Sequence, residues 1–115
     1  MNVIVAPVII MRKWDCDLEK EKQKELEEDK DKGRCGTRNS TTVDSSGGSG
    51  FLFHRRKEGN DEEDVAEGIA KDLMEHSPYS DRSSVATRCG CGMQTCRKKR
   101  GGFDVVELSC YFRKN

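Results

Sequence analysis

The clearest pattern of apolar and polar positions lies between residues 61 and 77. Apolar side chains recur there at the spacing of one face of an α-helix. Acidic residues crowd the start of this stretch, where the helix dipole favours them, and Ser77-Pro78 ends it. The pattern predicts an amphipathic helix at 61–77. Its apolar face packs either on the rest of this chain or, through residues 61–76, in the groove of a protein partner. The side chains named for that contact are Val65, Ile69, Leu73 and Met74.

A second pattern lies near the C-terminus, where every other residue is apolar or cysteine. This alternation is typical of a strand and predicts one at 103–112, with one face formed by Val106, Leu108, Cys110 and Phe112.

The remaining segments carry weaker patterns. Residues 1–14 are largely apolar, and a continuous β-branched run there indicates a strand or a docking tail. Residues 15–36 are mostly charged, with both signs interspersed, and predict a solvated helix or spacer that ends near Gly33 and Gly36. Residues 37–60 open with a Ser- and Gly-rich stretch typical of a flexible linker.

Composition changes this picture further, because 33% of the residues are hydrophobic and 37% are charged. Soluble domains run to roughly 45–50% apolar and about 25% charged. Since buried apolar area must offset the entropy lost on folding, we expect a mostly disordered chain. Its small α+β elements would be one amphipathic helix, a charged helix and a short C-terminal strand with a Cys knuckle.

Cysteines supply the candidate chemistry, and four of the six lie close together in a Cys-rich basic module at 85–115. Their spacing is C-x-C-x4-C-x13-C, and the intervening glycines tolerate the tight backbone of a metal knuckle. We expect zinc, bound by Cys89, Cys91, Cys96 and Cys110.

Disulfides and free thiols are the alternatives to a metal site. Six cysteines allow three disulfides in 15 connectivities, but that interpretation requires export. The apolar run at 3–11 precedes its first basic residues, which is the reverse of a signal peptide, and it is too short to span a membrane. We therefore expect an intracellular location.

The sequence SSVATRCGCG, followed by GGF and then by Cys110-Tyr111-Phe112, resembles GRF-type zinc fingers over residues 85–112. This resemblance implies a zinc-binding module that contacts single-stranded nucleic acid. It also implies that Cys89, Cys91 and Cys110 are ligands.

A basic run between Cys96 and the predicted strand has the composition of a phosphate-binding loop, a nuclear-import signal or a plain solvated loop. The residues that we expect to contact nucleic acid are Arg97, Lys98, Lys99 and Arg100. An enzyme is not expected, because the only histidines, His54 and His76, lie in no catalytic motif and the carboxylates lie in solvated runs.

The leading hypothesis is therefore a small, mostly disordered, non-enzymatic intracellular zinc protein whose C-terminal module contacts nucleic acid, with the nucleus as the location if the basic run is an import signal. Two alternatives remain open. One is a secreted, disulfide-stabilised peptide released from a flexible precursor, and the other is an adaptor that binds a protein partner through the helix at 61–76.

Overall fold

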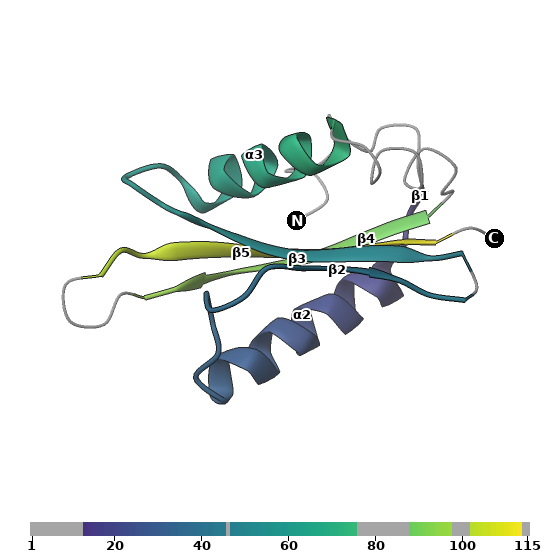
Figure 1. Ribbon diagram of the computed structural model, residues 1–115, viewed down its shortest axis with the longest axis horizontal. Helices are drawn as coiled ribbons and strands as arrows, with labels where there is room; N and C mark the ends of the chain where they lie inside the picture. The colour runs from purple at the N-terminus through teal and green to yellow at the C-terminus, as the bar shows by residue number, and fades with distance from the viewer. Residues whose placement is uncertain (1–12, 46, 76–87, 98–101, 114–115) are drawn as a thin grey trace.

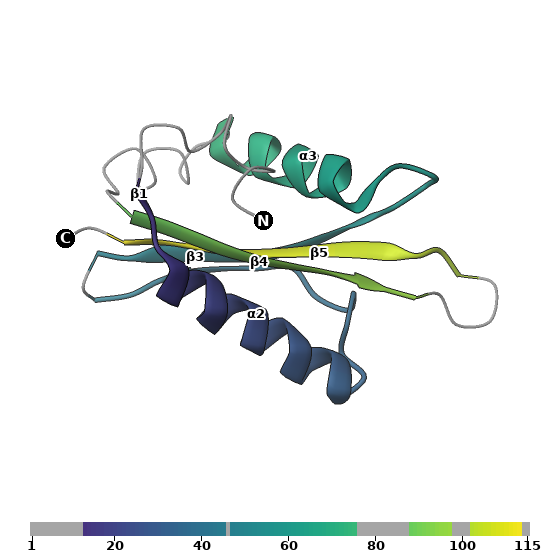
Figure 2. The ribbon, with the colours of Figure 1, turned by 180° about the vertical axis from the view of Figure 1, so that it is seen from behind.

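The protein, here a computed structural model that describes residues 13–45, 47–75, 88–97 and 102–113, is built on one β-sheet. The strand order is β1-β4-β5-β3-β2, and one helix covers each face (Figure 1; Figure 2). Strand β1 (Lys13–Trp14) runs parallel to β4 (Arg88–Cys96). The other neighbours are antiparallel, namely β4 with β5 (Val105–Arg113), β5 with β3 (Ser49–Arg56) and β3 with β2 (Ser40–Val43).

The face under helix α3 (Glu62–Glu75) holds the main apolar core (Figure 1). The predicted alternation of β5 appears here, since Val106, Leu108, Cys110 and Phe112 are all buried in it. The apolar stripe of α3 covers them and buries Val65, Ala66, Ile69 and Ala70. The helix stripe is thus packed on the protein's own sheet.

Helix α2 (Cys16–Asp31) lies across the opposite face, over β4 and β5 (Figure 2). Glycines on β4 permit this close approach. A Cβ on Gly90 would lie 2.6 Å from the Glu19 nitrogen, and one on Gly92 would lie 2.6 Å from the Gln23 nitrogen. Because side chains alternate across a strand, the repeat Cys-Gly-Cys-Gly turns its sulfurs toward α3 and its glycines toward α2.

The expectation of a mostly disordered chain is wrong. Helix α2 forms where a charged helix was expected, but it is packed rather than solvated, because Leu18 and Leu26 are 5% and 0% exposed against the sheet. The segment expected to be a flexible linker contributes β2 and β3, and β3 buries Phe51 and Leu52. Two leucines suffice in α2 because the glycines of β4 let its backbone approach closely.

Two further findings concern the N-terminal segment and the question of a membrane span. Residues 1–12 of the apolar N-terminal segment lie outside the described residues. Among the helices that the structure describes, none combines the length and apolar character that crossing a membrane requires.

Candidate functional site

The structure divides the four predicted zinc ligands between two disulfides and the core. Cys91 and Cys110 face each other across β4 and β5, with Cα atoms 4.1 Å apart, and are joined. Cys89 is buried on the same face and belongs to neither disulfide. Cys96, at the far end of β4, is joined to Cys35. The four side chains therefore do not surround one ion, and the two cysteines on the α3 face that form a bridge pack as core residues.

A different group does bring ligand atoms together. The two Sγ atoms of Cys35 and Cys96 and a carboxylate oxygen of Glu107 all lie within 4.8 Å of one another, a group that could hold a metal ion. Cys35 comes from the loop after α2, Cys96 from the end of β4 and Glu107 from β5. These residues are far apart in sequence, but the α2 face of the sheet places them together.

Glu107 is the most unusual member of this group, because its side chain is 0% exposed. The amide Nε2 of Gln94 donates to Oε1 at 2.8 Å, and the backbone N–H of Gly36 donates to Oε2 at 3.0 Å. Gln94 is itself held by donating to the Leu26 carbonyl at 2.8 Å. Within the described residues, no lysine or arginine forms an ion pair with Glu107. A buried carboxylate is thus oriented by neutral donors only, which leaves its charge uncompensated in a costly environment.

The contact between Cys35 and Glu107 has a different meaning in each redox state. Sγ of Cys35 lies 3.4 Å from Oε1 of Glu107. A disulfide sulfur carries no proton, so the bridged form cannot donate to that oxygen. Once the bridge opens, the thiol can donate a hydrogen bond, or the thiolate and the carboxylate can share a cation.

A second buried carboxylate holds the loop that carries Cys35. Asp29, in the last turn of α2, accepts hydrogen bonds from Arg34 at 2.9 Å and from Arg38. Burial alone would raise the pKa of Asp29, but the hydrogen bonds and charges of the two arginines outweigh it and lower the pKa below its ordinary 3.8. The arginine pair folds the chain back at residues 34–38 and so places Cys35 over Glu107.

An open cavity of about 490 Å³ lies beside the disulfide. Cys35 and Cys96 form part of its wall, and among the described residues that line it only Lys30 and Arg97 are charged. The remaining described wall consists of Gly33, Gly36, Thr37, Gly102, Phe103 and Val105. Small molecules in solvent can therefore approach the sulfurs from this side.

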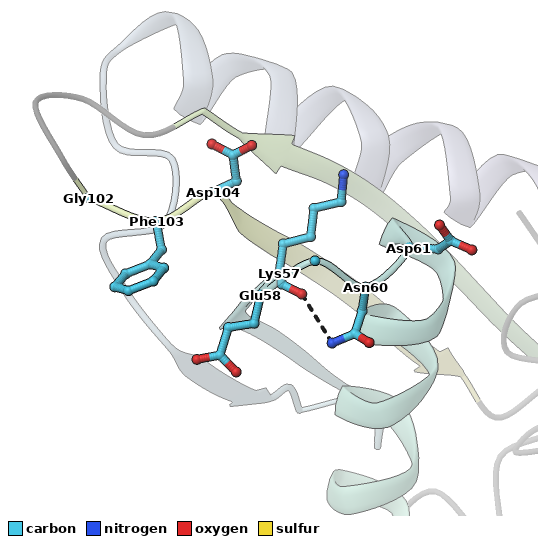
Figure 3. Close-up of a pocket in the computed structure, with 8 residues that line it drawn as sticks. Lys57, Glu58, Asn60, Asp61, Gly102, Phe103 and Asp104 are labelled. Atoms are coloured by element: carbon cyan, nitrogen blue, oxygen red, sulfur yellow. Dashed lines mark hydrogen bonds between the residues drawn. The ribbon is translucent and has the colours of Figure 1, made fainter.

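A second hollow, of about 450 Å³, lies between the turn from β3 to α3 and the residues that enter β5 (Figure 3). Its side chains carry mixed charge and do not converge, since Glu58, Asp61 and Asp104 point in different directions (Figure 3). The one hydrogen bond drawn there runs from Nδ2 of Asn60 to the Lys57 carbonyl at 3.2 Å (Figure 3). This hollow lacks the arrangement of a binding site.

The other predicted site residues are placed only in part. Arg97 is exposed at the end of β4, while Lys98, Lys99 and Arg100 lie outside the described residues, so the nucleic-acid contact stays a prediction. Within the helix proposed for a protein partner, Val65 and Ile69 are buried and Leu73 packs against the core. The Met74 side chain lies outside the described residues.

Comparisons with known proteins add no assignment to this geometry. Neither a protein-family model, nor a curated protein, nor a solved structure matches the chain. The site therefore rests on its own residues. Sequence reasoning missed Cys35 and Glu107; the available signal for the latter was a single acidic residue inside the apolar strand VVELSCYF.

Proposed function

We propose that this protein is a small, non-enzymatic protein that binds zinc at Cys35, Cys96 and Glu107 when the Cys35–Cys96 bridge is open. The bridged and metal-bound forms exclude each other, because zinc binds thiolates and a disulfide has none to offer. The protein would thus hold either a disulfide or a metal ion at one place in the fold. The observation that carries the proposal is the buried Glu107 carboxylate beside two sulfurs.

The spacing of the atoms supports zinc. With Zn–S near 2.3 Å and Zn–O near 2.0 Å, a tetrahedral site separates sulfur from oxygen by roughly 3.5 Å. The Cys35 Sγ to Glu107 Oε1 distance is 3.4 Å. Opening the bridge requires the two sulfurs to separate only to about 3.8 Å for the same geometry. Gln94 and Gly36 would continue to orient the carboxylate as outer partners of the ligand.

The charges support a cation as well. Two thiolates and a carboxylate around Zn²⁺ leave one net negative charge, which the exposed Lys30 and Arg97 would partly offset. The cavity leaves room for a water molecule as the fourth ligand. Zinc would replace the covalent link between the end of α2 and the end of β4 with a coordinate one.

Zinc content of the reduced protein tests this proposal. Native mass spectrometry after reduction and exposure to Zn²⁺ should show one ion per chain, and competition with a chromophoric chelator should give its affinity. Glu107→Gln, which preserves shape, should weaken that affinity, and Cys35→Ser should weaken it more strongly. Cys16→Ser is the matched control, because Cys16 is exposed on α2 and should leave binding unchanged. A reduced wild-type protein that binds no zinc contradicts the proposal.

Cobalt provides a ligand-specific test. Co²⁺ in the reduced protein should give a sulfur-to-metal charge-transfer absorption that scales with the number of thiolates. At saturating Co²⁺, Glu107→Gln should leave this charge-transfer band in place, because both thiolates remain. Cys96→Ser should reduce its intensity by half. An absorption insensitive to Cys96→Ser would place the metal elsewhere.

A second candidate function is that of an exported domain stabilised by disulfides, favoured by the two bridges that link β4 to β5 and to the α2 loop. Its test is the thiol count of protein isolated from its natural source without reductant and then denatured. Two titratable thiols, from Cys16 and Cys89, support this function, and six contradict it.

A further inference from the structure

The described wall of the cavity beside the Cys35–Cys96 bridge is positively charged. Lys30 and Arg97 are both exposed and line it, and the described part of the wall contains no carboxylate. Among the described residues, neither cation takes part in an ion pair. Glu107 lies behind the sulfurs and is fully buried, so it does not line the cavity.

The end of helix α2 does not cancel this charge. Helix C-termini present partial negative charge through unpaired carbonyls. Here the N–H groups of Lys32, Gly33 and Arg34 donate to carbonyls of the last turn of α2, at 3.1, 3.1 and 2.8 Å. Lys30 itself belongs to that turn. Among the described residues that line the cavity, Lys30 and Arg97 therefore supply the formal charge, and that charge is positive.

We propose that this cavity admits small thiols that carry a negative charge, and that such thiols are the reductants that open the Cys35–Cys96 disulfide. The inference concerns the same site and rests on the redox half of the proposed function. A ligand of this class would need a thiolate to attack the disulfide and a carboxylate to contact Lys30 or Arg97. Neutral thiols would enter without attraction, and cationic thiols would be repelled.

The chemistry is two successive exchanges. A thiolate attacks Sγ of Cys35, the more exposed member of the pair, and forms a mixed disulfide. The bond to Cys96 breaks, and its electron pair leaves on Cys96 as a thiolate beside Arg97. A second thiol molecule then attacks the small-molecule sulfur of the mixed disulfide, which releases the Cys35 thiolate and a small disulfide. Two small thiols are oxidised and one protein disulfide is reduced.

The other bridge offers no such route. Cys91 and Cys110 are 0% and 1% exposed and lie among the apolar side chains under α3. A small charged reductant would need to enter an apolar core to reach them, at a large desolvation cost. The charge preference should therefore appear at Cys35–Cys96 and should be absent at Cys91–Cys110.

Three thiols of different charge test the inference on the full oxidised protein: mercaptoacetate, 2-mercaptoethanol and cysteamine. Alkylation and peptide mapping measure the rate at which each thiol opens Cys35–Cys96. Each rate is then divided by the rate at which the same thiol reduces a small neutral disulfide, which corrects for its intrinsic reactivity. We expect mercaptoacetate to exceed 2-mercaptoethanol by about tenfold at low salt, with cysteamine slowest, and the spread to shrink at high salt. Equal normalised rates would overturn the inference.

Variants separate the cavity charge from general effects. Lys30→Gln with Arg97→Gln should bring the three normalised rates together, while Lys20→Gln, an exposed lysine near the other end of α2, should leave the spread intact. A preference that survives the double change contradicts the inference. Zinc binding, measured separately on the reduced double variant, distinguishes the two proposals. If the wild-type protein binds zinc but shows no charge preference, only this inference is wrong. If it shows the charge preference but binds no zinc, only the zinc site is wrong.

Discussion

The two disulfides both hold strand β4, but in opposite surroundings. Cys91–Cys110 links neighbouring strands, spans 19 residues and is sealed under α3. Cys35–Cys96 spans 61 residues, joins the loop after α2 to the end of β4, and lies between a buried carboxylate and an open cavity. The first bridge acts as core packing. The second has what reactivity requires, namely access for a reagent through a cavity lined by two cations, Lys30 and Arg97.

The largest expected difference between the bridges is their rate of reduction in the folded protein. A limited amount of a phosphine reductant at neutral pH should open Cys35–Cys96 on the order of 100-fold faster than Cys91–Cys110, because the buried pair must wait for an opening of the core. Alkylation at timed intervals and peptide mapping would measure both rates. Simultaneous opening of the two bridges would show that burial under α3 does not protect Cys91–Cys110.

The second difference between the bridges is how much each stabilises the fold, and here the order is reversed: the bridge that is reduced faster contributes more. Chain-entropy reasoning assigns about 4 kcal/mol to a bridge across 61 residues and about 3 kcal/mol to one across 19. The more reactive bridge is thus the one whose opening costs more. Reducing it would loosen the α2 side of the molecule unless a metal ion takes over the link.

Single-bridge variants measure this difference without the effect of altered packing. A protein with Cys91→Ala and Cys110→Ala retains only the long bridge, and one with Cys35→Ala and Cys96→Ala retains only the short one. For each, the free energy of unfolding in urea is compared between its own oxidised and reduced forms, with a chelator present. A short bridge that stabilises more than the long one would contradict the entropic account.

A third comparison uses glycines on the two faces. Gly92→Ala would place a methyl 2.6 Å from the backbone nitrogen of Gln23, so α2 must shift, and we expect a loss of about 2 kcal/mol in the free energy of unfolding. Gly68→Ala, in α3, would meet only the flexible end of Arg55 at 2.9 Å. Higher helix propensity should then stabilise that variant by up to about 1 kcal/mol.

These two variants should also change the reduction rates of the two disulfides differently. Gly92→Ala should speed the opening of Cys35–Cys96 and leave Cys91–Cys110 slow, because only the α2 side is disturbed. Thermal or urea denaturation and the alkylation assay provide both measurements. Equal destabilisation by the two glycine changes would show that α2 does not depend on close contact with β4.

The same contrast explains what could be predicted from sequence. Periodicity located α3 and the buried face of β5, because each of these elements packs one regular stripe on the core. It failed for α2, whose contact with the sheet depends on glycines of β4 rather than on a stripe of its own. The repeat Cys-Gly-Cys-Gly has the composition of a metal knuckle, and only the pairing of β4 with β5 shows that it alternates between two faces.

The candidate site was harder to predict, because its members are brought together by the fold. Cys35 lies 61 residues before Cys96, and no local pattern connects them. The burial of Glu107 could be recognised only once its strand was known to be covered on both faces. Local sequence carries information on which face a residue occupies, but not on which distant loop covers that face.

The smallest expected effect concerns acid and the loop that places Cys35. The two arginines hold the pKa of Asp29 below 3.8, so the stabilisation from its carboxylate is present above that pH and is lost as pH falls through the lowered pKa. At neutral pH, Asp29→Asn should cost about 1.5 kcal/mol, the lower end of the range for a hydrogen bond to a charged group, because both arginines are largely exposed. The gap between wild type and variant should close below pH 3.8.

Acid should therefore loosen one bridge before the other. Phosphine reductants work at low pH, so the ratio of opening rates at Cys35–Cys96 and Cys91–Cys110 can be followed down the titration by peptide mapping. We expect this ratio to rise in wild type as Asp29 is protonated and to be already raised, and flatter with pH, in Asp29→Asn. Asp72→Asn, which removes an exposed ion pair with Arg55 on the other side of the sheet, is the control and should follow wild type. If Asp29→Asn also follows wild type, the arginine pair does not hold the Cys35 loop in place.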